Sequence, residues 1–209
     1  YMKGFYNEMS VNEVLNNVNL IGIAGVAGSG KDTFAEIIKK VFESNGFEVN
    51  CLSFAKKLKE EVAEVSKSMY GIDTTNCTRE EKNLIRPLLL AHGAIMREKT
   101  KGQYWIDGIK DLVSNDKINI ITDVRFCEYE CDEVDWIQSN NGIVVHITRF
   151  FEENGERIYI SPDNEYEKRN NKILKNRANY SFSWPTDISK QIKYSNKFFE
   201  WLVKNYLER

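Results

Sequence analysis

The chain has 209 residues, of which 42% are hydrophobic and 29% are charged, and its formal net charge at pH 7 is −2. This composition predicts one domain with a sizeable core, and the small net charge argues against nucleic acid or an anionic membrane as a partner. No apolar run approaches the ~18 residues of a membrane span, and no signal-peptide-like segment precedes the first predicted strand. Four cysteines without a CxxC pair and only two histidines argue against a zinc site, so we expect reduced thiols in a cytoplasmic protein.

The first quarter of the chain alternates helix and strand signals. Residues 3–18 carry apolar side chains at helical spacing and predict a short leading helix. Residues 19–24 are an apolar segment with two isoleucines, which predicts the first strand. Apolar residues then recur every three or four positions over 34–42, and the helix that they predict ends at Gly46. Residues 47–54 predict the second strand.

A glycine-rich stretch, Gly25-Val26-Ala27-Gly28-Ser29-Gly30-Lys31-Asp32-Thr33, joins the first strand to its helix. Strand, glycine-rich turn, lysine and helix form the context of a phosphate-binding loop. Glycines let backbone N–H groups wrap an anion, and the helix N-terminus adds positive partial charge. An ordinary glycine turn is the alternative, but the flanks favour a nucleoside-triphosphate site. Its candidate residues are Gly25, Ala27, Gly28, Ser29, Gly30, Lys31, Asp32 and Thr33.

Helices dominate the middle of the chain. A charged helix follows the second strand, a longer helix is predicted over residues 79–99, and a shorter one over 104–113. Thr78 and Glu81 form a capping box that opens the long helix. Pro87 lies inside that helix, so we expect a break or kink just before it.

The second half returns to strands separated by helices. Residues 118–124 and 143–148 are nearly continuous valine and isoleucine runs, which are typical of parallel strands covered on both faces. A short helix is predicted over 133–139. Residues 150–177 are polar with charges of both signs, as in a mobile lid or a solvated insertion. A fifth strand over residues 179–184 and a terminal helical region over 186–208 complete a three-layer α/β fold with a central parallel sheet of about five strands.

The loop alone does not separate a kinase from a GTPase or a transport ATPase. The size suits a small-molecule kinase, and the chain contains no Asn-Lys-x-Asp run that would read guanine. Many phosphate loops place a hydroxyl for Mg²⁺ directly after the lysine, but here that residue is Asp32, followed by Thr33. A carboxylate is also favourable in a first helical turn. A structural role for Asp32 and a role near Mg²⁺ or the acceptor both stay open.

Asp123 and Arg125 end the strand over 118–124, where the carboxyl ends of parallel strands place ligands. A buried carboxylate must be paired or metal-bound, so we assign Asp123 to Mg²⁺, to its waters or to the acceptor phosphate, with an N-cap as the alternative. Arginine offers a bidentate fork to phosphate. We therefore assign Arg125 to a phosphate, with a surface salt bridge as the alternative.

Phosphoryl transfer consists mostly of positioning and charge neutralisation, so several cations must converge on the phosphates. Further basic candidates are Lys56, Lys57, Arg86, Arg97, Arg149, Arg157, Lys168, Arg169 and Arg177. For each, a solvated helix face is the alternative. Phe54, Trp105 and Trp184 could stack on a base, although aromatic side chains more often pack in a core.

Four motifs in order resemble one known family. They are the loop Gly25–Thr33, the Ser53-Phe54-Ala55 run with Leu58-Lys59, the Arg86-Pro87-Leu88-Leu89 run with Gly93, and the Asp123-Val124-Arg125-Phe126 run. Together they are similar to the deoxynucleoside monophosphate kinases of large bacteriophages, which are P-loop nucleoside monophosphate kinases. The resemblance covers residues 19 to 149, and the turn from Cys127 to Asp132 is longer than in the family pattern.

The resemblance implies transfer of the γ-phosphate of ATP to a deoxynucleoside monophosphate. Lys31, Asp32, Asp123 and Arg125 would then be the catalytic residues, and Asp32, Thr33 and Asp123 would hold Mg²⁺. The residues expected to bind the acceptor are Phe54, Lys56, Arg86, Arg97, Trp105, Arg125 and Glu133, the last being the glutamate that opens the next helix. The cofactors would be ATP and Mg²⁺, and a homodimer is compatible with the sequence.

The resemblance also divides the single predicted domain, residues 1–209, into functional parts. The core would comprise residues 19–54, 118–149 and 179–209, the helical acceptor-binding insertion residues 55–113, and the lid-like insertion residues 150–177. Two other hypotheses remain: another small-molecule kinase resembling dephospho-coenzyme A kinase, and a regulatory module that binds a nucleotide without transferring phosphate. If the protein is viral, we expect it in the host cytoplasm.

Overall fold

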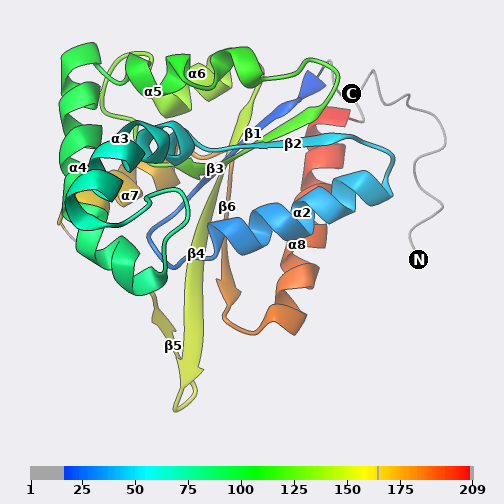
Figure 1. The fold of residues 1–209 in the computed structure, drawn as a ribbon. Coiled ribbons are helices and arrows are strands. Elements are labelled where there is room, and N and C mark those ends of the chain that lie inside the picture. The colour runs from blue at the N-terminus through cyan, green and yellow to red at the C-terminus, as the bar shows by residue number, and fades with distance from the viewer. Residues whose placement is uncertain (1–16, 164, 208–209) are drawn as a thin grey trace.

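A computed structural model describes residues 17–163 and 165–207 (Figure 1). The predicted leading helix over 3–18 lies outside this part of the chain, except for its last two residues. Among the described residues, no helix combines the length and the apolar composition needed to cross a bilayer.

Six strands form one sheet, and five of them run parallel. In spatial order the parallel strands are β2 (Val49–Leu52), β3 (Ile118–Val124), β1 (Leu20–Ala24), β4 (Ile143–Glu153) and β6 (Tyr180–Pro185). The short β5 (Glu156–Tyr159) pairs antiparallel with the end of β4. β1 therefore lies at the centre, and everything that follows its carboxyl end is placed at the middle of the sheet edge.

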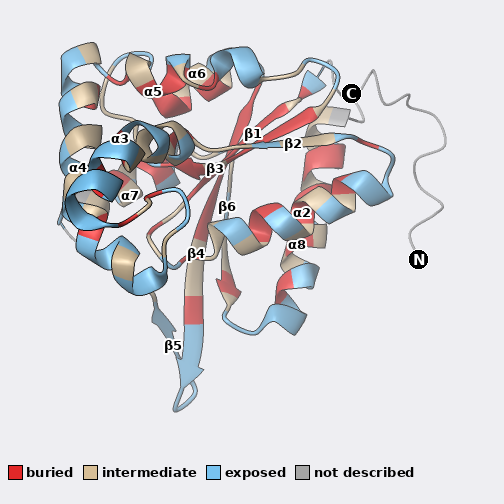
Figure 2. Ribbon diagram, viewed as in Figure 1, coloured by how far each residue is buried: buried red, intermediate tan, exposed pale blue. Residues whose placement is uncertain are grey.

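Two layers of helices cover the sheet (Figures 1 and 2). On one face lie α2 (Lys31–Ser44) and α8 (Ile188–Leu202), the latter continuing into a π-helical turn over Val203–Leu207. On the other face lie α5 (Gln103–Asp107), a 3-10 turn over Lys110–Leu112, α6 (Glu133–Ser139) and α7 (Glu165–Arg177). Beside them, α3 (Phe54–Tyr70) and α4 (Arg79–Thr100) pack on each other around a small core of their own. The predicted three-layer α/β fold with a parallel sheet of about five strands is confirmed.

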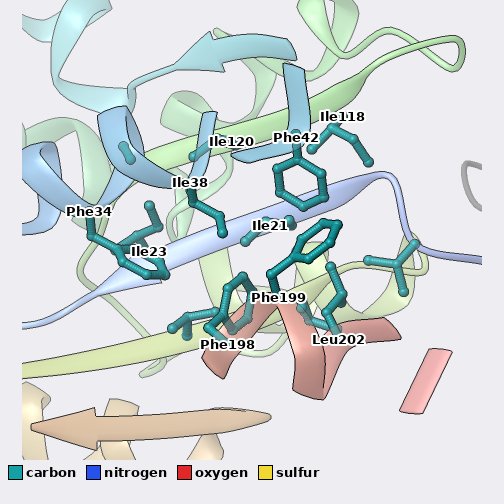
Figure 3. Close-up of a cluster of buried hydrophobic side chains, with 14 of the residues drawn as sticks. Ile21, Ile23, Phe34, Ile38, Phe42, Ile118, Ile120, Phe198, Phe199 and Leu202 are labelled. Carbon is teal, nitrogen blue, oxygen red and sulfur yellow. The ribbon is translucent and has the colours of Figure 1, made fainter. Parts of the chain in front are cut away.

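Aromatic side chains join α2 and α8 to the sheet (Figure 3). The ring of Phe34 meets Trp184 edge-on at 5.8 Å between centroids and Phe198 at 5.5 Å. Phe42 packs against Phe199 at 5.3 Å. Aromatic pairs of this geometry contribute about 0.5–1.5 kcal/mol each beyond the area that they bury. The start of α2, where the glycine-rich loop ends, is thus held against the core.

Two predicted boundaries were wrong. The second strand ends at Leu52, because the backbone N–H groups of Phe54 and Ala55 donate to the Asp123 carboxylate and start α3. The break expected at Pro87 does not occur, and α4 runs through it without interruption. Ile85 and Leu89, on either side of Pro87, are both buried in the α3–α4 core, so tertiary packing keeps the helix intact although proline removes one hydrogen bond.

Much of the segment predicted as a lid or solvated insertion forms regular structure, over residues 150–159 and 165–177. β4 continues to Glu153, turns at Asn154 and Gly155, which both have positive φ (51° and 81°), and returns as β5. Two such residues between antiparallel strands are the usual signature of a tight hairpin. α7 then returns to the sheet, where Leu174 is buried in the core.

Candidate functional site

Crowding fixes the conformation of the loop after β1. Gly25, Gly28 and Gly30 all have positive φ, at 148°, 76° and 90°. A Cβ on Gly25 would lie 2.4 Å from the carbonyl oxygen of Ile147, and one on Gly30 would lie 2.7 Å from the Trp184 ring. Both the backbone conformation and the neighbours therefore require glycine.

Trp184, at the carboxyl end of β6, packs against the glycine-rich loop on its core side. Its side chain is fully buried, and its indole N–H donates to the carbonyl of Ser29 at 2.8 Å. The sequence left open that this ring could stack on a base. A buried ring that packs against Gly30 and Phe34 offers no face to a ligand, so Trp184 positions the loop instead.

Lys31 turns back over the loop that precedes it. Its ammonium donates to the carbonyls of Gly25 at 2.7 Å and Val26 at 2.9 Å. Burial first, and then the positive charge of Arg125, lower its pKa from 10.5 to about 8, while the carboxylates of Glu167 and Asp32 act in the opposite direction. Lys31 and Arg125 thus form a pair of neighbouring cations at the loop.

Two further groups in the loop are placed as an anion site requires. The Ser29 hydroxyl is buried and has no hydrogen-bond partner within the described part of the chain. The backbone N–H of Ala27 donates to the carboxylate of Glu167 in α7, at 2.7 Å. A carboxylate oxygen on a loop N–H shows that this backbone accepts an anion. The cradle therefore fits a phosphate group.

Asp123 links β3 to the start of α3. Its carboxylate accepts hydrogen bonds from the Ser53 hydroxyl at 2.9 Å, from the Phe54 N–H at 2.9 Å and from the Ala55 N–H at 2.8 Å. These are the unpaired donors of a helix N-terminus, so Asp123 caps α3 from a distant strand. Its charge is within electrostatic reach of Lys31. This capping role is the alternative that the sequence left open, although for a different helix.

The other expected Mg²⁺ ligands lie in the first turn of α2. Asp32 is exposed and Thr33 is half-buried. Within residues 17–163 and 165–207, no group of three or more His, Cys, Asp and Glu side chains is arranged to hold a metal ion.

Glu133 shapes the turn that carries Arg125. Its buried carboxyl accepts hydrogen bonds from the N–H groups of Arg125 at 2.6 Å and Phe126 at 3.1 Å. Burial raises its pKa from 4.5 to about 8, against the lowering effect of the Arg125 N–H. The Arg125 side chain itself is exposed. Glu133 was expected to bind the acceptor, but its carboxyl holds the backbone of the turn instead.

Arg97 does not face the loop. Its guanidinium is 3% exposed and forms a bidentate pair with Asp132, with one contact at 2.7 Å. Burial would raise the pKa of Asp132, but the hydrogen bonds from Arg97 and from the Glu128 N–H lower it below its ordinary value. The guanidinium also lies 3.8 Å from the Phe126 ring centroid. Arg97, which was expected to bind the acceptor, is thus already neutralised by Asp132. This ion pair fixes the lengthened turn over residues 127–132.

The remaining expected acceptor residues fall into two groups. Phe54 and Trp105 are both 5% exposed and belong to the core between α5 and the sheet, so core packing, not stacking, accounts for them. Lys56 and Arg86 lie on the helical insertion with their heads near solvent, paired with Glu60 at 3.9 Å and Asp163 at 3.0 Å. Exposed ion pairs of this kind are weak, so both cations stay available to a ligand.

Arg149 was only one of many basic candidates in the sequence. It lies in β4, directly after the predicted strand over 143–148, and its guanidinium donates to the carbonyls of Gly28 at 3.4 Å and Thr186 at 3.3 Å. Its Nε is buried without a hydrogen-bond partner in the part of the chain that the structure describes. Its position after a predicted parallel strand, like that of Arg125, was the signal that could have singled it out.

No family model and no curated protein matches the sequence. Among solved structures, similar chains include a dephospho-CoA kinase from Campylobacter jejuni, at 14% identity over 89% of this chain and 98% of that chain, with a TM-score of 0.46. A shikimate kinase from Acinetobacter baumannii in complex with shikimate is 10% identical over 94% and 99% of the two chains, with a TM-score of 0.49. A gluconokinase from Sinorhizobium meliloti 1021 is 11% identical over 90% and 95%, with a TM-score of 0.41. Likenesses this distant do not identify a substrate.

We predict that Trp184→Phe destabilises the fold and also weakens anion binding at the loop. The variant keeps most of the ring but leaves the buried Ser29 carbonyl without its donor, which costs about 1–3 kcal/mol. Isothermal titration with ATP and urea unfolding measure the two effects. Trp201→Phe is the matched control, because Trp201 packs in the same aromatic cluster on Tyr180 and Phe198. Equal ATP affinities in the two variants would contradict a positioning role for Trp184.

We predict that Glu133→Gln changes how stability depends on pH. With a pKa raised from 4.5 to about 8, the folded wild type keeps a proton that the unfolded chain releases above 4.5. Stability from this proton is present at low pH and is lost as the pH rises to about 8. The glutamine variant has no such proton to lose. The difference between its melting temperature and that of wild type should therefore rise from about pH 5 to about pH 9. A difference in melting temperature that stays constant across that range would show that Glu133 is ionised in the folded protein.

Proposed function

We propose that this chain is an ATP-dependent phosphotransferase that acts on deoxynucleoside monophosphates. The observation that carries the proposal is the loop after the central strand β1, where crowded glycines, a buried hydroxyl and Lys31 surround an N–H group that already binds a carboxylate. Arg125 from the neighbouring strand β3 adds a second cation beside Lys31. Phosphoryl transfer needs such a convergence of donors and positive charge.

In this proposal the loop holds the triphosphate of ATP. The backbone N–H groups of residues 27–33 and the Lys31 ammonium bind the β- and γ-phosphates. Lys31 must then leave the carbonyls of Gly25 and Val26, which it contacts in the free protein. Asp32 and Thr33 in the first turn of α2 would hold Mg²⁺, which neutralises the phosphate charge. Asp123 keeps α3 in place beside this site.

The acceptor would lie between the loop and the helical insertion. Arg125 projects from the end of β3, and Arg86 and Lys56 lie on α4 and α3 with weakly held side chains. Their charges can bind a monophosphate group. The chain would work as one domain in the cytoplasm, with residues 55–113 as the acceptor-binding insertion and residues 150–177 as a cover over the loop. The donor site alone would equally serve a kinase with another small acceptor, such as dephospho-coenzyme A.

We predict that purified protein with Mg-ATP releases ADP only when a suitable acceptor is present. The assay couples ADP release to dTMP, dGMP, dCMP, dAMP, dUMP and dephospho-coenzyme A in parallel. Lys31→Ala should abolish turnover with the fold intact, because the point charge on the transferred phosphate is lost. ADP release stimulated by dephospho-coenzyme A alone would show that this compound, and not a deoxynucleoside monophosphate, is the acceptor. ATP binding without any stimulated release would favour a regulatory module.

We predict that ATP affinity falls above pH 8. The pKa of Lys31 in the free protein is about 8, so below that pH the ammonium is charged and binding changes little. Above it, the lysine must take up a proton when the phosphates bind, and the Kd should rise up to about tenfold per pH unit. Titration calorimetry from about pH 6.5 to about pH 9.5 measures this. Lys31→Ala should bind weakly with no such slope, and a flat wild-type profile would place Lys31 away from the phosphates.

A further inference from the structure

Glu167 is a carboxylate inside the candidate phosphate site. Its Oε1 accepts the Ala27 N–H at 2.7 Å, although the two residues are 140 positions apart. It is also close enough to Lys31 for its charge to act on that ammonium. An N–H of the loop and the lysine are the groups that a phosphate would use. The side chain therefore occupies part of the place of an anionic ligand.

A short chain of contacts holds this carboxylate in place. The second oxygen of Glu167 accepts the N–H of Asp163 at 2.9 Å. The carboxylate of Asp163 in turn pairs with Arg86 of α4 at 3.0 Å, and both of these side chains are at least 40% exposed. The Asp163–Arg86 contact, which joins this segment to the helical insertion, thus lies at the surface.

Core packing and polar contacts fix the body of α7. Leu174 is buried in the core, the Asn171 side chain bonds to His146 at 2.8 Å, and Arg177 pairs with Asp135 at 2.5 Å. In the first turn, Glu165 is 88% exposed at its side chain. A ligand that displaces Glu167 would need side-chain rotation and a small movement of the first turn, while these contacts keep the rest of α7 packed.

We propose that Glu167 is an internal plug of the phosphate loop: its carboxylate fills part of the anion site in the free protein, and a di- or triphosphate ligand must displace it. The proposal rests on the proposed function only in that the natural ligand is a nucleotide phosphate. Displacement costs a charge-assisted hydrogen bond, and a carboxylate that stays near the phosphates repels them. The plug lowers affinity and lets only a ligand that satisfies the whole loop open the site.

The test compares anion binding in two matched variants of the full chain. Glu167→Gln removes the negative charge without changing the size of the side chain, and Glu165→Gln makes the same change in net charge two residues away, outside the loop. Titration calorimetry with sodium pyrophosphate in the absence of Mg²⁺ probes the loop directly. We expect Glu167→Gln to bind pyrophosphate about tenfold more tightly than wild type, and Glu165→Gln to match wild type. Melting temperatures confirm that both variants are folded.

Each other outcome has a definite meaning. Equal tightening in both variants would reduce the effect to net charge. Unchanged binding in Glu167→Gln would show that the carboxylate does not compete with the ligand, and weaker binding would show that it helps to hold the ligand. Each of these results overturns the plug. Tightening in Glu167→Gln without acceptor-dependent ADP release in wild type would uphold the plug and overturn the proposed function. Absence of pyrophosphate binding in all three proteins would overturn the anion site itself.

Discussion

The candidate site depends on how closely the core packs against the loop after β1. The Ile147 carbonyl from β4 and the Trp184 ring from β6 leave no room for a side chain on Gly25 or Gly30. These neighbours restrict the loop backbone to conformations with positive φ, in which its N–H groups point inward. Trp184 packs on Phe34 of the aromatic core and donates a hydrogen bond to Ser29 of the loop. The aromatic core under α2 and the loop are therefore directly connected. Changes in the core should therefore affect ligand binding.

Around this loop, the carboxylates and the cations have different tasks. The side chains of Asp123, Asp132 and Glu133 are buried and accept hydrogen bonds from backbone N–H groups. Their oxygens serve the fold, by capping α3 and by shaping the turn after β3. The charge of Arg125 acts on Lys31 at the loop. Because these carboxyl groups are bound within the fold, the candidate site favours anions although the net charge of the chain is slightly negative.

Much of the local structure could be predicted from spacing alone. The strand over 118–124 and the helix over 133–139 lie where periodicity and composition indicated. The hairpin at Asn154-Gly155 was missed although this dipeptide is a strong turn signal, because the charged flanks suggested a lid. The break at Pro87 was wrong because buried neighbours on α4 outweigh one lost hydrogen bond.

The sequence by itself indicated most of the strands and helices in their order and the glycine-rich loop between the first two, because these depend on residues close together in the chain. Only the tertiary structure decided which charged side chains remain free. Arg97 is neutralised by Asp132, 35 positions away, and the Ala27 N–H is bound by Glu167, 140 positions away. Arg97 and Arg125 look alike in a list of basic residues, yet the first is buried in a pair and the second is exposed beside Lys31. Burial and pairing arise from long-range packing, which local spacing does not encode.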